Sequence, residues 1–191
     1  MPMKVLFFII AFLPCFAFSQ DTIQSELLDR LIWQKINDYR ASLNIPRATI
    51  FERGLMRAFS RRVTNGNALS GISVHSDSVG YFCNTECLFS LVSKGNTPNQ
   101  FTLVDNLRKG DFRYLADEAV KGWQNSPSHN RLIKGSDYTI STVTTMIIIS
   151  PLDKGYSVRF EASHHSLSNH IGATFTDDMD AYVAALIKRG Y

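Results

Sequence analysis

The residue pattern of this chain changes sharply after Gly135, and this change constrains the fold more than any other feature. From Tyr138 to Ile149 the sequence is dominated by threonine, valine and isoleucine, and from Tyr156 to Glu161 apolar and polar residues alternate. Both patterns are typical of β-strands. The segment between them, Pro-Leu-Asp-Lys-Gly, has the composition of a hairpin loop. We therefore expect a β-hairpin in the second half of the chain.

The first part of the chain has helical periodicity instead. Apolar residues recur every three or four positions from Ser25 to Leu43, from Leu55 to Val63 and from Leu115 to Gln124, which predicts three amphipathic helices. Asn125-Ser126-Pro127 ends the third. Helices followed by a hairpin predict an α+β fold in which helices cover an antiparallel sheet.

Four further segments are assigned from local pattern alone. We expect an extended segment over Gly71–His75, a short helix over Thr85–Val92, a loop over Gly95–Gln100 and a last helix over Asp177–Arg189.

The first 19 residues have the parts of a secretory signal peptide. Lys4 precedes an apolar run from Val5 to Phe18, and Ala17 and Ser19 supply the small residues required just before a cleavage site at Gln20. The apolar run has about 14 residues, whereas a membrane span needs about 20, so we favour cleavage over a retained anchor. The predicted protein is secreted, to the periplasm or the extracellular space, and does not span a membrane once cleaved.

These features predict a signal peptide over 1–19, one domain over 20–162, and a histidine-containing loop with a C-terminal helix over 163–191. The formal net charge is only +3, and the basic residues are scattered rather than clustered. This distribution argues against nucleic acid as a partner.

Two cysteines, Cys83 and Cys87, remain after the predicted cleavage. An oxidising compartment permits them to pair. Their spacing of four residues brings the backbones close enough on a helix but aims the side chains poorly. The sequence leaves a disulfide open.

Histidines and one glutamate are the candidate functional residues. His75 lies in a polar turn, Glu86 lies in an otherwise apolar stretch, and His129 follows Trp123 in a polar turn. Plain structural roles are also open: a solvated turn for His75, a helix N-terminus for Glu86, and a core anchor for Trp123. A separate tract contains His164, His165 and His170. Such a tract is either a metal site or a solvated loop, and we favour the loop because nothing in it defines a coordination geometry.

The run Trp-Gln-Asn-Ser-Pro-Ser-His-Asn-Arg-Leu-Ile, from Trp123 to Ile133, resembles the signature of the CAP superfamily in its bacterial form. This superfamily comprises the cysteine-rich secretory proteins, antigen 5 and the pathogenesis-related proteins. Upstream, Asn37 and Arg40 match the Asn-x-x-Arg of the first CAP helix. The resemblance implies an α-β-α sandwich with a small antiparallel sheet between helices, to which the last helix would be an addition.

The resemblance also implies a central groove with two histidines and two acids that binds a divalent metal in some members. His75 and His129 match the histidines, and Glu86 matches the glutamate of a Gly-Glu-Asn motif. Ser126 stands where eukaryotic members have a second glutamate. The implied site is therefore His75, Glu86 and His129, holding zinc or another divalent cation with water completing the coordination.

Three functions are compatible with these residues. The one we favour is a secreted binding module for a lipid, glycan or protein ligand. The second is a hydrolase, either zinc-assisted with Glu86 as base, or using Cys87 or Ser126 as nucleophile. The sequence contains neither a nucleophile elbow nor a His-Glu-x-x-His motif, which disfavours this alternative. The third is a structural envelope or adhesion protein in which the same residues form a buried polar network.

Overall fold

A computed structural model describes residues 20–76, 83, 85–136 and 138–168. The predicted signal peptide, His170 and the predicted C-terminal helix lie outside the described residues. The described helices are α1 (Glu26–Ser42), α2 (Leu55–Ser70), α3 (Pro98–Arg108), α4 (Arg113–Asn125) and α5 (Pro127–Ile133). The described strands are β1 (Asp21–Ile23), β2 (Ile50–Phe51), β3 (Thr85–Gly95), β4 (Tyr138–Pro151) and β5 (Tyr156–Ser168). Among these helices none is long and apolar enough to cross a membrane.

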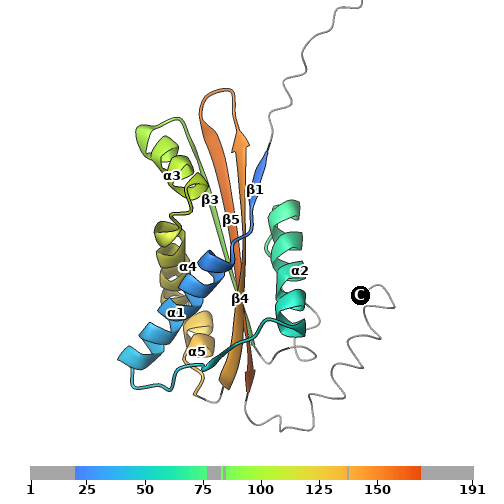
Figure 1. Cartoon of the computed structure of the whole chain (residues 1–191), viewed down its shortest axis with the longest axis vertical. Helices are drawn as coiled ribbons and strands as arrows, with labels where there is room; N and C mark the ends of the chain where they lie inside the picture. Colours follow the sequence, from blue (N-terminus) through green and yellow to red (C-terminus); the bar gives the residue numbers. More distant parts are fainter. Residues whose placement is uncertain (1–19, 77–82, 84, 137, 169–191) are drawn as a thin grey trace, which may run out of the picture.

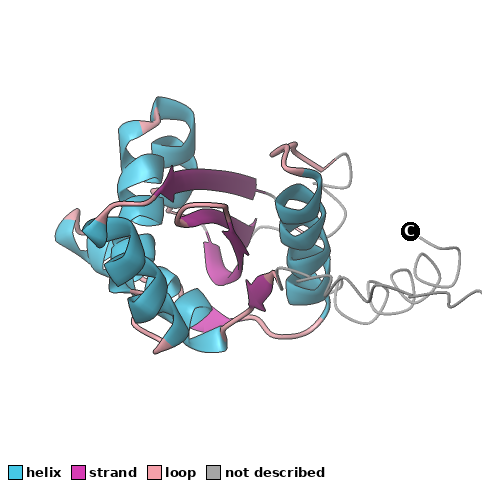
Figure 2. Ribbon diagram, turned by 90° about the horizontal axis from the view of Figure 1, so that it is seen from above, coloured by secondary structure: helices cyan, strands magenta, loops and turns pink. Residues whose placement is uncertain are grey.

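One sheet forms the middle layer of the fold. Its strand order is β1-β4-β5-β3, with antiparallel pairing between neighbours, and the two-residue strand β2 pairs in parallel with β4. Helix α2 covers one face, and α1, α3, α4 and α5 lie on the other (Figures 1 and 2). The predicted α+β class and its α-β-α layering are confirmed.

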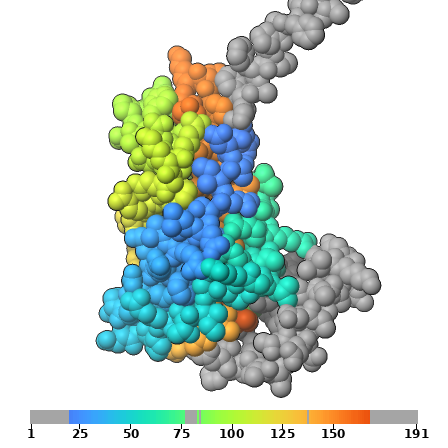
Figure 3. Space-filling view, viewed as in Figure 1, coloured from blue at the N-terminus to red at the C-terminus, as the bar shows by residue number. Residues whose placement is uncertain are grey.

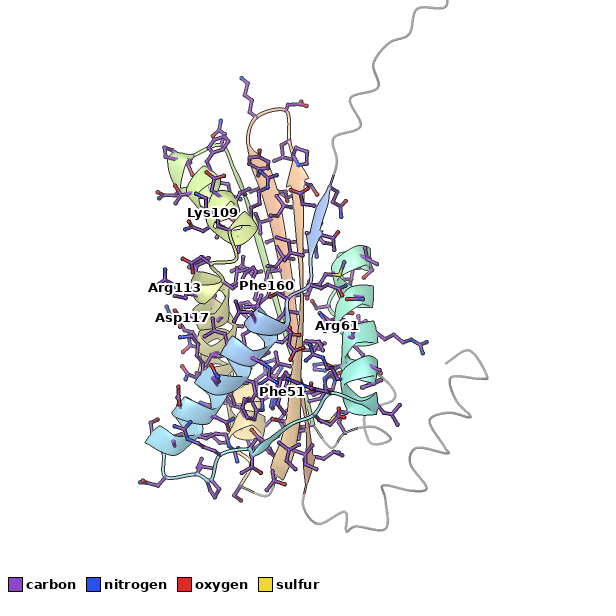
Figure 4. All side chains as sticks on the ribbon, viewed as in Figure 1. Phe51, Arg61, Lys109, Arg113, Asp117 and Phe160 are labelled. Carbon is purple, nitrogen blue, oxygen red and sulfur yellow. The ribbon has the colours of Figure 1, made fainter. Side chains whose placement is uncertain are left out.

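The two faces of the hairpin differ in chemistry because successive side chains of a strand point to opposite sides. Toward α1 and α4 lie apolar residues such as Ile147 and Phe160, which pack on Leu28 and Trp123. Toward α2 lie mainly hydroxyl and ionisable side chains, together with Met146 and Ile148, which form a small apolar cluster with Ala68 of α2. Phe160 and Arg61 mark the two sides in Figure 4. The apolar face thus supplies most of the core, and the α2 face is available for polar chemistry.

Two arginines tie α2 to this polar face. Arg57 and Arg61 donate to the carbonyl oxygens of Val143 and Thr145 at 3.3 and 2.7 Å. Both guanidinium groups also pair with the buried carboxylate of Asp29 in α1, at 2.6 and 2.8 Å. Helix α2 is therefore held in a fixed position on β4, and so are the side chains that α2 turns toward the sheet.

The helix predicted over Thr85–Val92 is wrong. These residues form β3, which pairs with β5 along its whole length. Cys87, Phe89 and Leu91 enter the apolar core on one side, with Glu86 on the other. Adjacent apolar residues such as Cys87 and Leu88 also fit the spacing of a helix, so the sequence pattern alone does not distinguish a helix from a strand here. The pairing with β5 makes the segment a strand.

The loop predicted over Gly95–Gln100 is also wrong at its end, because α3 begins at Pro98. Thr97 caps it by accepting a hydrogen bond from the Gln100 N–H at 3.3 Å, and Pro98 is the first helical residue. A threonine followed by proline is a regular helix start, so the signal was present in the sequence.

The loop predicted from residue 163 is wrong, because β5 continues to Ser168. His164 and His165 are fully buried, not solvated. No glycine or proline interrupts the chain between Gly155 and Gly172, which was the missed signal for a longer strand. The extended segment predicted over Gly71–His75 belongs to no strand and forms part of a loop after α2.

Candidate functional site

Three elements bring His75, Glu86 and His129 together near the start of β3. His75 lies in the loop after α2, Glu86 is the second residue of β3, and His129 lies in α5. In the described sheet β3 is the edge strand. Residues from the helical layers on both faces, His75 after α2 and His129 in α5, can therefore reach the outer edge of β3. In the space-filling view of one face, α1 and the segment that leads into α2 lie in front of the sheet (Figure 3).

Glu86 contacts His75 directly. Oε2 of Glu86 lies 2.6 Å from Nδ1 of His75 and accepts a hydrogen bond from the Ser76 N–H at 3.1 Å. The Glu86 side chain is 2% exposed, whereas that of His75 is 61% exposed. Since an ionised carboxylate only accepts hydrogen bonds, the His75 proton is on Nδ1. Nε2 of His75 is then the nitrogen that can bind a ligand.

The sequence did not identify His165 as part of this site. His165 lies directly opposite Glu86 in the pairing of β3 with β5, and its Nε2 is 3.0 Å from Oε1 of Glu86. Its other nitrogen, Nδ1, is 2.8 Å from Oγ of Ser60 in α2. Burial pushes the pKa of Glu86 upward, but the hydrogen bonds from the two histidines outweigh burial and hold this pKa below its ordinary value.

A row of hydroxyl groups continues from Ser60 between α2 and the sheet. Oγ of Ser60 is 2.7 Å from Oγ1 of Thr144, which is 2.7 Å from Oγ1 of Thr64. Oγ1 of Thr64 is in turn 2.8 Å from Oγ of Ser163. All four side chains are buried. Glu86 is thus the charged end of a polar network that runs into the interior.

His129 completes the exposed side of the site. The ring centroids of His75 and His129 are 6.3 Å apart. Burial lowers the pKa of His129, and the positive charge that His75 can carry lowers it further. A lowered pKa favours the neutral ring, which is the form that binds a metal.

These residues fit a two-histidine metal site better than a site with three protein ligands. Both oxygens of Glu86 are already engaged in hydrogen bonds, so the carboxylate braces His75 and is poorly placed as a ligand. Two imidazoles that share a tetrahedral zinc ion have centroids about 5 Å apart, because each Zn–N bond is about 2.0–2.1 Å. The observed pair would have to close by about 1 Å. Within the part of the chain that the structure describes, no group of three or more His, Cys, Asp or Glu side chains is arranged to hold a metal.

A second buried carboxylate, Glu161, anchors the loop that carries His75. It accepts hydrogen bonds from the hydroxyls of Ser73 and Ser90 at 2.7 and 2.6 Å, and Arg159 lies 3.5 Å away. The two carboxylates therefore hold the loop after α2, Glu161 through Ser73 and Glu86 through His75, and the side chain of Asn67 adds two hydrogen bonds with the backbone of Val74.

The motif residues have structural contacts. Asn37 exchanges two hydrogen bonds with the backbone of Ala48. Arg40 is buried and donates to the carbonyls of Pro46, Ile133 and Gly135. These contacts fasten α1 to the segment that follows it and to the end of α5.

Two other motif residues lie near α5. Trp123 is buried and donates its indole N–H to the Leu88 carbonyl at 3.0 Å, which fastens α4 to β3. Ser126, at the position of the second family glutamate, is half-buried with its hydroxyl 3.2 Å from that of Ser128. It touches neither candidate histidine by any hydrogen bond among the described residues.

Cys83 and Cys87 are buried thiols and do not form a disulfide with each other. Burial raises the pKa of Cys87 to about 12, and the charge of Glu86 adds to the effect. A thiol with so high a pKa is a weak nucleophile. His164 points to the opposite face from His165, and its ring lies near those of Trp123 and Tyr138.

Comparison with known proteins adds little. No protein-family model and no curated protein matches the chain. Among solved structures, an outer surface protein from Borrelia burgdorferi is similar, with a TM-score of 0.44 and 11% sequence identity over 79% of this chain and 100% of that one. A similarity at this level carries no argument about function.

Proposed function

We propose that this chain is a secreted CAP-like binding domain whose His75 and His129 bind a divalent transition-metal ion, zinc above all. The observation that carries the proposal is the 2.6 Å contact between Oε2 of Glu86 and Nδ1 of His75, with the ring of His129 6.3 Å away. Metal-binding histidines regularly donate their other ring N–H to a carboxylate, which sets the tautomer and orients the ring. Glu86 has that relation to His75.

Two histidines leave part of the coordination shell of the metal open. Zinc in proteins is usually four-coordinate, so water or a donor group of an extracellular partner would take the remaining positions. The secretory pattern of residues 1–19 supports an extracellular or periplasmic location for such a partner. The α-β-α layering supports the CAP resemblance, because that resemblance implies the same architecture.

The geometry favours binding over hydrolysis. A general base must reach a bound water, but Glu86 is 2% exposed and both its oxygens are engaged. Its lowered pKa makes it a weak base. Glu86, His165 and Ser60 form an acid-histidine-serine series, but Ser60 is fully buried where no substrate can reach its hydroxyl. Cys87 is a buried thiol with a raised pKa.

Calorimetric titration of the mature protein with zinc tests the proposal. We expect one site in the parent and at least about 10-fold weaker binding in His75→Ala and in His129→Ala. His170→Ala is the matched control and should bind as the parent does. Equal affinity in all four proteins would overturn the assignment, and loss of binding in the control alone would move the site to His170.

A further inference from the structure

We propose that His165 is a positioning residue, which holds the Glu86 carboxylate and thereby determines which nitrogen of the exposed His75 is free. The consequence for metal affinity rests on the proposed function. The consequence for the His75 tautomer does not, because it concerns the metal-free protein.

The argument starts from the acceptor-only chemistry of Glu86. Each of its two oxygens faces a different imidazole, at 2.6 Å from Nδ1 of His75 and at 3.0 Å from Nε2 of His165. An ionised carboxylate has no proton to give, so both of these nitrogens carry one. The tautomers of the two histidines are therefore linked through one carboxylate.

Ser60 supports the tautomer of His165 from behind. When the neutral ring of His165 carries its proton on Nε2, its Nδ1 is a hydrogen-bond acceptor. Ser60 then donates its single hydroxyl proton to Nδ1 of His165. Ser60 then accepts from the hydroxyl of Thr144 at 2.7 Å. The direction of these hydrogen bonds runs from the interior toward Glu86.

Burial makes this arrangement rigid. His165, Ser60 and Thr144 are fully buried, and the ring of Phe59 packs edge-on against His165 with centroids 5.3 Å apart. Hydrogen bonds are electrostatically stronger in such surroundings than in water. By contrast, His75 is 61% exposed, so its orientation depends on the contact with Glu86.

The neighbour of His165 provides a matched control. His164 and His165 are both fully buried in β5, but they point to opposite faces of the sheet. Among the described residues, neither ring nitrogen of His164 has a hydrogen-bond partner. His164→Phe and His165→Phe are thus the same chemical change at adjacent buried positions, and only the second removes a donor to Glu86.

Nitrogen-15 NMR of the histidines in the metal-free mature protein gives the first readout. We expect His75 to be protonated on Nδ1 in the parent and in His164→Phe, and to become a mixture of tautomers in His165→Phe. His165→Gln keeps an N–H donor and should restore the parent signal. Ser60→Ala is a smaller change and should shift the His75 signal in the same direction as His165→Phe. It therefore tests the inference even if the His165→Phe protein fails to fold.

Zinc calorimetry of the same proteins gives the second readout. Loss of the direct hydrogen-bond partner of a metal ligand weakens metal binding by about 10–100-fold. His165 acts one step further away, through Glu86, so we expect a loss at the lower end of that range, about 10-fold, in His165→Phe and parent affinity in His164→Phe. An unchanged His75 signal in both His165→Phe and Ser60→Ala overturns the inference and leaves the metal proposal standing. A shifted signal in a protein that binds no zinc overturns the metal proposal and leaves the positioning role standing.

Discussion

Replacing His164 with phenylalanine is expected to make the protein more resistant to acid. Burial lowers the pKa of His164 from an ordinary 6.5 to about 3, with smaller contributions from the charges of His165 and Arg40. The unfolded chain therefore binds a proton at this residue below pH 6.5 that the folded protein does not bind. Stability contributed by the neutral ring is present above pH 6.5 and is lost progressively as the pH falls toward 3.

The size of the effect follows from the two pKa values. One pKa unit corresponds to about 1.4 kcal/mol, so the fall from pH 7 to pH 5 costs the parent about 2 kcal/mol at His164 alone. Phenylalanine does not titrate and removes this cost. At neutral pH the substitution also removes two buried ring nitrogens that have no hydrogen-bond partner in the described part of the chain. Their removal offsets the strain of the larger ring, so the stability at pH 7 should change by less than about 1.5 kcal/mol.

Urea unfolding of the parent and of His164→Phe at pH 7.5, 6 and 5 measures this difference. A change in packing alone shifts the free energy of unfolding equally at every pH, so the value at pH 7.5 serves as the internal control. The expected result is a gap that widens by about 2 kcal/mol in favour of the variant between pH 7.5 and pH 5. Parallel pH profiles would refute the burial argument.

Three other outcomes are expected. His129→Ala should melt at the parent temperature in the presence of a chelator and lose only the zinc-dependent rise; a large fall without metal would favour the structural network instead. Gly155→Ala should destabilise by about 1–3 kcal/mol in urea unfolding, because φ is +93° and a Cβ there meets the Gly95 carbonyl. Ser73→Ala removes a hydrogen bond to Glu161 and should speed amide exchange in the loop after α2 by about 5–10-fold; unchanged exchange would mean that this bond does not hold the loop.

Local signals in the sequence were sufficient for several elements. The apolar stripe predicted from Ser25 to Leu43 lies along α1, and Ser25 caps this helix by accepting a hydrogen bond from the Leu28 N–H. The β-rich run after Gly135 forms β4, and its partner strand follows a short turn. The position of α4 and its end before Pro127 were predicted as well. Each depends on interactions within a few residues, which a sequence pattern contains.

The candidate site was predictable only in part. His75, Glu86 and His129 were identified by their resemblance to family positions, and the structure places the first two in contact. His165 and Ser60 could not be found in this way, because they reach Glu86 through the pairing of β3 with β5 and the docking of α2. Contacts of this kind join residues far apart in the chain.

The β4–β5 hairpin separates what the sequence determines from what the tertiary structure decides. Composition and turn residues determined that β4 and β5 form, because strand propensity and a short turn act locally. Only the tertiary structure decided how far β5 extends and what each of its side chains meets. Adjacent residues of a strand point to opposite faces, so His164 became a buried neutral ring in the core while His165 became the partner of Glu86. The layers that pack on the two faces, rather than the residues themselves, set this difference.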